Sequence, residues 1–121
     1  MPKVFIINDS GHDYSEAKKY GTLVFLTKGK VASYATTQHY RVFSEKMKDA
    51  SPDDYILVTS LASMNCIAGW IIGTLGFPLN LLLYKEDKYV VRRIMPRLLE
   101  PSYFTTDKEN EDESREGDID S

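Results

Sequence analysis

Short apolar runs alternate with helical stretches along most of this chain, and that alternation limits the fold more than any other sequence feature. The order reads β-α-β-α-β-α-β-β. Strands separated by crossover helices imply a mostly parallel sheet with helices on both faces. The length of 121 residues matches one domain of ordinary size. We therefore predict a single three-layer α/β domain.

Five segments have the apolar, β-branched composition of strands, and they cover residues 3–8, 22–27, 55–60, 78–84 and 88–94. The last two are joined by four residues at most, Lys85 to Lys88, too few for a parallel crossover, so we expect an antiparallel hairpin at one sheet edge. Right-handed crossovers then favour the strand order 2-1-3-4-5. This order predicts a flavodoxin-like or Rossmann-like fold.

Three helices are expected between the strands. The first is the segment SEAKKY at residues 15–20, where Glu16 follows Asp13 by three positions, as in a capping box. The second runs from about residue 32 to 50 and turns one apolar stripe toward the sheet. The third, from about residue 63 to 75, is apolar nearly all round, and Gly69 and Gly73 would allow close approach to the sheet.

The uncharged segment from Leu61 to Leu83 is long enough to cross a bilayer. Gly76 and Pro78 interrupt it, so we interpret it as a buried helix followed by a buried strand, and we expect no membrane partner. The N-terminal apolar run is too short for the core of a secretory signal. Cys66 cannot form an internal disulfide, and we expect it to be a buried, inert thiol in a cytoplasmic protein.

Charge divides the chain into two parts. The segment from Asp107 to Ser121 holds eight acidic and two basic residues, a net charge of −6, and the rest of the chain therefore carries +3 of the total of −3. With Ile119 as its only large apolar residue, the segment buries too little to offset the entropy of folding. We predict a folded domain over residues 1–106 and a disordered acidic tail over residues 107–121.

The strongest candidate for a site is the point where the strand order reverses, because ligands of open parallel sheets bind there, beyond the carboxyl ends of the strands. Two loops should meet at this point. The first loop supplies Asn8, Asp9, Ser10, Gly11, His12, Asp13 and Tyr14, and the second supplies Thr59, Ser60, Ser63 and Asn65. After the second strand, Thr27 and Lys28 could bring a lysine to an anionic ligand.

Each of these groups also has an ordinary structural explanation. Hydroxyl groups at a helix N-terminus can complete an anion site, but Ser60 or Ser63 could simply cap the helix. Asp9 and Asp13 are typical of any strand-to-helix turn, and Lys28 is typical of a solvated turn. These alternatives remain open at the level of the sequence.

His12 is the best candidate for proton chemistry, because its intrinsic pKa lies near neutrality and Asp9 or Asp13 could orient its ring. An enzyme would use His12 and Asp13, although no G-x-S-x-G motif supports a hydrolase. Glycine-rich phosphate fingerprints are absent, and His12, His39 and Cys66 do not have the spacing of metal ligands. We therefore predict no cofactor and no metal.

Basic residues cluster on the predicted edge hairpin and just after it, namely Lys85, Lys88, Arg92, Arg93 and Arg97. Charges on an edge strand ordinarily prevent sheet extension. A body charge of +3 without interleaved aromatic residues argues against nucleic acid as the partner. The hairpin and the acidic tail could instead engage a host protein.

Three runs, VFIINDSGHDYSEAKKYGTLVFLTKG, YILVTSLASM and LNLLLYK, carry a resemblance over residues 3 to 94. They resemble small α/β proteins encoded by bacteriophages, in which a GHDYS-like loop follows the first strand. The resemblance implies an accessory role inside an infected bacterium and transfers no activity to any residue.

The favoured hypothesis is a protein that binds or sequesters a small anionic metabolite or a nucleotide at the two loops. The second hypothesis is an interaction module that modulates a host factor through the hairpin and the tail, and the third is a small hydrolase that uses His12. The sequence leaves the ligand identity and the oligomeric state open.

Overall fold

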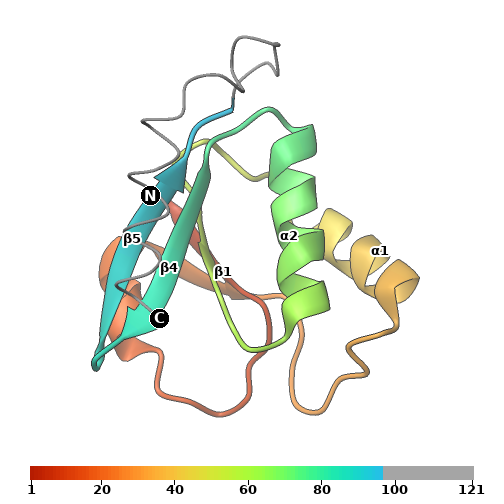
Figure 1. The fold of residues 1–121 in the computed structure, drawn as a ribbon, viewed down its shortest axis with the longest axis horizontal. Coiled ribbons are helices and arrows are strands. Elements are labelled where there is room, and N and C mark those ends of the chain that lie inside the picture. The colour runs from red at the N-terminus through yellow and green to blue at the C-terminus, as the bar shows by residue number, and fades with distance from the viewer. Residues whose placement is uncertain (97–121) are drawn as a thin grey trace, which may run out of the picture.

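The computed structural model describes residues 1–96, so the predicted boundary at residue 106 and the predicted acidic tail lie outside the described residues. One five-stranded sheet organises the described part, with the strand order β2-β1-β3-β4-β5 (Figure 1). Its strands are β1 (Lys3–Ile6), β2 (Thr22–Phe25), β3 (Tyr55–Leu57), β4 (Leu79–Lys85) and β5 (Lys88–Ile94). The first three pairings are parallel and the β4–β5 pairing is antiparallel. The predicted strand order and edge hairpin are confirmed.

The edge hairpin turns through only two residues, Glu86 and Asp87, whose φ angles are 50° and 65°. Two consecutive positive φ angles are the signature of a type I′ turn, which matches the right-handed twist of a two-stranded ribbon. Lys85 is therefore paired with Lys88, and Tyr84 is paired with Tyr89. The short connection in the sequence thus fixes which residues lie opposite one another along the whole hairpin.

The first three strands end two to three residues earlier than predicted, at Ile6, Phe25 and Leu57. The polar residues that follow bond their side chains to neighbouring backbone in place of a regular ladder. Thr27 Oγ1 donates to the Ile7 carbonyl oxygen at 2.8 Å, and Asn65 Oδ1 accepts a hydrogen bond from the Thr59 backbone N–H at 3.2 Å. The predicted ends of the first and third strands therefore belong to loops that reach the candidate site, whereas the predicted end of the second strand does not.

The helices lie where the sequence places them, with differences in type and length. The segment Ser15–Tyr20 is a 3-10 helix, η1, whose N-cap residue Tyr14 makes no side-chain cap. Asp13 accepts from the Ser15 N–H at 2.9 Å, so the predicted capping box with Glu16 is wrong. Helix α1 (Thr36–Lys46) is shorter than the predicted 32–50, because the chain before it forms tight turns and the His39 ring bonds to the carbonyl oxygen of Ala32 at 2.8 Å. Helix α2 (Ala62–Thr74) is close to its predicted range.

The two faces of the sheet are covered unequally. Helices α1 and α2 lie on one side of it (Figure 1) and enclose the larger core with Phe5, Ile56 and Phe43. The opposite face is covered by η1, and its core is smaller, with Val4, Ile6, Tyr14, Ala17, Leu57 and Leu82. Because η1 is short, part of the hairpin on that face stays open to solvent.

Helix α2 is apolar nearly all round but buried on one side only. Met64, Ala68, Ile71 and Ile72 face the core, whereas Cys66 and Trp70 are exposed. The prediction of a buried Cys66 is therefore wrong, because position 66 lies on the side of α2 away from the sheet. Close approach at Gly73 is also wrong, since nothing lies within 4 Å of its Cβ position. Within residues 1–96, no helix combines the length and the apolar character needed to cross a membrane.

Candidate functional site

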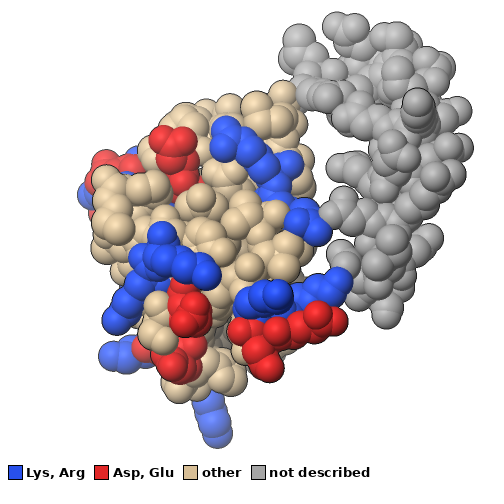
Figure 2. Space-filling model, turned by 90° about the vertical axis from the view of Figure 1, so that its left-hand side faces the viewer, with Lys and Arg blue, Asp and Glu red and all other residues tan. Residues whose placement is uncertain are grey.

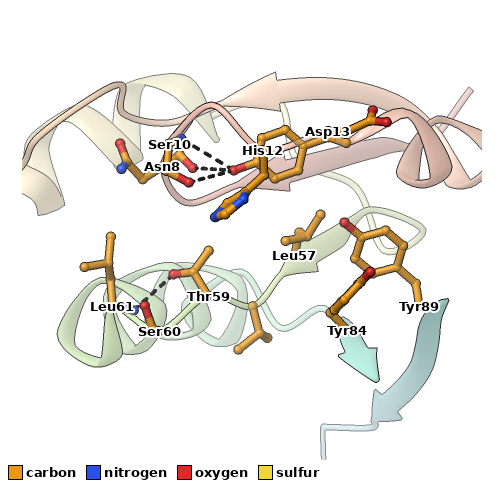
Figure 3. A pocket seen from close by; sticks show the side chains of 12 residues that line it. Asn8, Ser10, His12, Asp13, Leu57, Thr59, Ser60, Leu61, Tyr84 and Tyr89 are labelled. Atoms are coloured by element: carbon orange, nitrogen blue, oxygen red, sulfur yellow. Dashed lines mark hydrogen bonds between the residues drawn. The ribbon is translucent and has the colours of Figure 1, made fainter. Parts of the chain in front are cut away.

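A cavity of about 610 Å³ opens beside the carboxyl ends of β1 and β3, which are neighbours in the sheet as the strand order requires. In Figure 3, the loop after β1 lies on one side of this pocket, the loop after β3 lies on the other, and two tyrosines of the hairpin stand at one end. The lining residues are Asn8, Ser10, His12, Asp13, Tyr14, Leu57, Val58, Thr59, Ser60, Leu61, Tyr84 and Tyr89.

The structure divides the predicted site residues into two groups. Seven predicted residues line the pocket, and they are Asn8, Ser10, His12, Asp13, Tyr14, Thr59 and Ser60. Six others are not among the lining residues, and they are Asp9, Gly11, Thr27, Lys28, Ser63 and Asn65. The predicted meeting of the two loops is therefore present, and the residues outside the lining have roles that hold those loops in place.

Tyr14 holds the loop after β1 in place. Its phenol donates a hydrogen bond to the Asn8 carbonyl oxygen at 3.1 Å and lies 3.2 Å from Ser10 Oγ. Its ring is buried and contacts the Phe25 ring edge-on, with 5.6 Å between centroids. Asp9 closes the turn, because its Oδ1 accepts a hydrogen bond from the Gly11 backbone N–H at 3.1 Å. The loop is thus fixed by its own side chains.

A second network ties the end of β1 to the end of β2, away from the pocket. Asn8 Nδ2 donates to the Gly29 carbonyl oxygen at 2.8 Å, and Asn8 Oδ1 accepts from Thr27 Oγ1 at 2.8 Å. Lys28 forms a parallel bridge with Asp9 through the backbone. Thr27 and Lys28 therefore extend the β1–β2 pairing, and Lys28 does not line the pocket.

The loop after β3 is held by a reciprocal pair of hydrogen bonds. Asn65 Oδ1 accepts from the Thr59 N–H, and Asn65 Nδ2 donates to the Thr59 carbonyl oxygen at 2.7 Å. Ser63 Oγ donates to the carbonyl oxygen of Ser33, which joins this loop to the chain before α1. Asn65 and Ser63 therefore brace this loop through contacts within the protein.

Helix α2 begins without a side-chain cap, and its N-cap residue is Leu61, so the alternative in which Ser60 or Ser63 caps the helix is wrong. An uncapped helix N-terminus leaves backbone N–H groups without an intrahelical acceptor and carries a partial positive charge. Ser60 and Leu61 line the pocket just before these groups. The first N–H groups of α2 therefore bring a partial positive charge beside this end of the pocket.

His12 is exposed, and its ring contacts Tyr14 edge-on with 6.3 Å between centroids. The backbone N–H of Ser15 donates to Asp13 Oδ1 at 2.9 Å, and this bond, helped by the charge of Lys18, lowers the pKa of the Asp13 carboxyl. Asp9 Oδ1 is likewise engaged by Gly11. Among the residues that the structure describes, neither carboxylate bonds to the His12 ring, so the predicted orienting pair is not formed.

The sequence prediction missed the two tyrosines, Tyr84 and Tyr89, and the apolar residues Leu57, Val58 and Leu61. The two tyrosine rings stack edge-to-face with centroids 5.3 Å apart. Partial desolvation raises the pKa of both phenols, with the charge of Asp87 adding to the effect on Tyr84. Both hydroxyls are therefore neutral hydrogen-bonding groups near neutral pH. The two-residue turn could have placed the rings opposite each other, but not beside the pocket.

Residues 2–95 match the family model of the Phage Pam3 gp32-like protein. The chain belongs to this family. The match includes all five strands, both loops of the pocket and the hairpin with its two tyrosines. The resemblance to small phage proteins is thereby confirmed. Comparison with curated proteins and with solved structures gave no significant match.

Proposed function

We propose that this Pam3 gp32-like protein binds a small molecule with a planar ring at one end and a negative charge at the other, and that a nucleotide is the ligand class. The single observation that carries the proposal is the composition of the pocket. Two neutral tyrosine rings stand at one end, and hydroxyl groups beside the uncapped N-terminus of α2 form another part of it. A volume of about 610 Å³ is within the usual range for small-molecule sites.

The tyrosine end suits a nucleobase. Tyr84 is 62% exposed, so its ring is open to a ligand, while Tyr89 packs against the smaller core and supports it. Stacking of a base on an aromatic side chain contributes about 1 to 3 kcal/mol in single-strand binding proteins. The Tyr89 hydroxyl and the Thr59 hydroxyl, which accepts from the Leu61 N–H at 3.2 Å and keeps its own proton to donate, can bond ribose or base edges, whereas the Tyr84 hydroxyl donates to Asp87 Oδ1 at 3.3 Å.

The α2 end suits the phosphate. Within the described residues no lysine or arginine lines the pocket, and the charged carboxylate of Asp13 does. Binding of an anion therefore depends on the first N–H groups of α2, on Ser60 and on the His12 ring, which points into the pocket (Figure 3), and phosphate at a helix N-terminus is a common arrangement. This limits the proposal to ligands with modest charge, such as a nucleoside monophosphate.

Thermal denaturation with and without nucleotides tests the proposal. We expect AMP or GMP to raise the melting temperature, since a ligand at a hundredfold excess over its Kd stabilises the native state by about 2.7 kcal/mol. Tyr84→Ala should abolish this shift. Tyr40→Ala is the matched control, because Tyr40 is also an exposed tyrosine but lies on α1 and outside the pocket lining. Absence of any shift with nucleosides and nucleotides would refute the proposal.

His12→Ala gives a second prediction. We expect it to weaken nucleotide binding by about 1.5 to 3 kcal/mol, the loss typical of a hydrogen bond to a charged group, with a stability change below about 1 kcal/mol. The small stability effect follows because His12 is exposed and its described contact is one edge-on ring. Titration calorimetry and urea denaturation of the same variant measure the two quantities. Loss of stability with unchanged affinity would make His12 a structural residue.

A protein-interaction module is the second candidate function, and the exposed apolar side chains on and after the hairpin favour it. Tyr84, Val91, Ile94 and Met95 are all exposed. Figure 2 shows the side of the molecule on which the hairpin lies, with Lys and Arg side chains among uncharged ones. The hydrolase alternative lacks such support, because His12 has no described orienting carboxylate.

A further inference from the structure

We propose that the outer edge of β5 pairs with the same edge of a second copy of this chain, in an antiparallel register centred on Val91. Strand β5 is the last strand of the sheet order, and within residues 1–96 no strand pairs with its outer side. Seven residues without a break form this edge, which is long enough for an extended ladder. The pairing would join two five-stranded sheets into one continuous sheet.

The direction of the β5 backbone groups follows from contacts on the inner strands. The Leu82 carbonyl oxygen accepts a hydrogen bond from the Val58 N–H at 3.1 Å, so the backbone groups of Leu82 point toward β3. Leu82 is opposite Val91, and the two therefore form a non-hydrogen-bonded pair. The N–H and C=O of Val91 point outward, and so do those of Tyr89 and Arg93. Consistently, the Val91 carbonyl oxygen accepts from Arg92 Nη1 at 3.0 Å.

Pairing of β5 with its copy about a two-fold axis at Val91 forms hydrogen bonds through all three outward-facing residues, Tyr89, Val91 and Arg93. It also keeps like charges apart. The opposite pairs are Val91 with Val91, Val90 with Arg92, Tyr89 with Arg93, and Lys88 with Ile94. Moving the two-fold axis to residue 90 would place Lys88 opposite Arg92, and moving it to residue 92 would place Arg92 opposite itself. Like charges directly opposite one another destabilise a sheet. The charge pattern therefore selects the central register.

Exposed apolar side chains lie on both faces of this edge, between the charged residues that the central register keeps apart. Val91 is 39% exposed and Ile94 is 53% exposed, and they lie on opposite faces of the strand. Tyr89, by contrast, packs its ring into the smaller core, so a partner's Arg93 would meet a ring held in place. A cation beside the face or edge of an ordered tyrosine ring is a favourable contact.

This arrangement would also add to the pocket. Side chains directly opposite in a sheet lie on the same face, so the partner's Arg93 would lie beside Tyr89, which lines the pocket. The pocket lining contains no lysine or arginine of its own within the described residues. The second copy would thereby supply a cation near a bound nucleotide, and this last step rests on the proposed function.

Sedimentation equilibrium of the full chain over a range of concentrations tests the pairing without any ligand. We expect a monomer–dimer equilibrium. Val91→Pro should raise the dimer dissociation constant at least about tenfold, because it removes both central hydrogen bonds, while an outward-facing N–H makes proline tolerable on this edge strand. Val91→Thr is the matched control, since it keeps the N–H and the β-branched shape and should leave the dimer intact.

Val91→Lys serves as a second variant, because it keeps the backbone N–H and sets two charges opposite each other only in the dimer. Circular dichroism confirms that each variant is folded. A wild-type chain that stays monomeric at all concentrations would overturn the proposal. A dimer that survives both Val91→Pro and Val91→Lys would overturn it as well.

Arg93→Ala separates the pairing from the pocket. We expect this variant to remain dimeric and its affinity for both adenosine and AMP to fall about tenfold, because the partner's Arg93 lies beside Tyr89, at the end of the pocket where the proposed function places the base. Unchanged affinity for both compounds would refute the contribution of the partner's Arg93. If neither compound binds the wild-type protein, the proposed function fails and the sedimentation result stands by itself.

Discussion

Replacing Asp54 with alanine should lower the free energy of unfolding by about 3 to 5 kcal/mol, the cost of removing one partner from a buried charged cluster. The Asp54 side chain is 1% exposed at the end of the sheet opposite the pocket. Its Oδ1 accepts from the Lys3 backbone N–H at 2.9 Å and from Ser51 Oγ at 3.0 Å. Its Oδ2 accepts from the Ser51 N–H at 2.8 Å and lies 3.6 Å from Lys3 Nζ.

Urea denaturation measures this effect, and two further variants identify its cause. Asp54→Asn keeps the shape but offers one acceptor oxygen to a site where both oxygens accept, so it should also be clearly destabilising. Asp53→Ala is the matched control, because Asp53 is an exposed neighbour and should change stability by less than about 0.5 kcal/mol. Equal stability of the Asp54→Ala and Asp53→Ala proteins would contradict the structural role of Asp54.

Gly21→Ala is expected to lower the stability by about 3 kcal/mol, at the upper end of the cost of overpacking. A Cβ atom at position 21 would lie 2.2 Å from the Pro2 carbonyl oxygen and 2.7 Å from its carbonyl carbon. The same oxygen accepts from the Thr22 N–H at 2.9 Å, which starts the pairing of β2 with β1. The clash is with backbone, so β2 would have to move away from β1 to relieve it.

The control for this substitution is another glycine in open space. At Gly73, on α2, no atom lies within 4 Å of the added Cβ, and alanine should stabilise the helix by up to about 1 kcal/mol. Thermal and urea unfolding of both variants therefore should give changes of opposite sign. A Gly21→Ala protein as stable as the wild type would show that the start of β2 adjusts without cost.

Much of the architecture was predictable because it depends on local patterns. The apolar runs located the strands, and the short connection between residues 84 and 89 required an antiparallel hairpin, which the two-residue turn at Glu86 and Asp87 confirms. Strand order followed from the handedness of crossovers. Helix type and length were less predictable, since η1 is a 3-10 helix and α1 is shorter than its apolar stripe, for reasons that lie in tertiary contacts such as that of His39.

The candidate site was predictable as a place but not as a set of residues. Both loops reach the pocket, because the carboxyl ends of adjacent parallel strands share one edge. The direction of each side chain was not predictable from polarity. Asn65 and Ser63 turn to neighbouring backbone, and Lys28 extends the pairing of two strands. Tyr84 and Tyr89, which the sequence suggested only as strand residues, form the aromatic end of the site.

By itself, then, the sequence determined the order of elements, the hairpin and the edge of the sheet where two polar loops meet, because periodicity and connection length act within short stretches of chain. Only the tertiary structure decided which polar groups bond within the protein and which face the cavity. Hydrogen-bond partners such as Asn8 and Gly29, or Ser63 and Ser33, are brought together by packing between distant segments. It also placed the tyrosine rings of the hairpin beside the pocket, where η1 does not cover them. How much of a sheet a short helix covers depends on how the two pack.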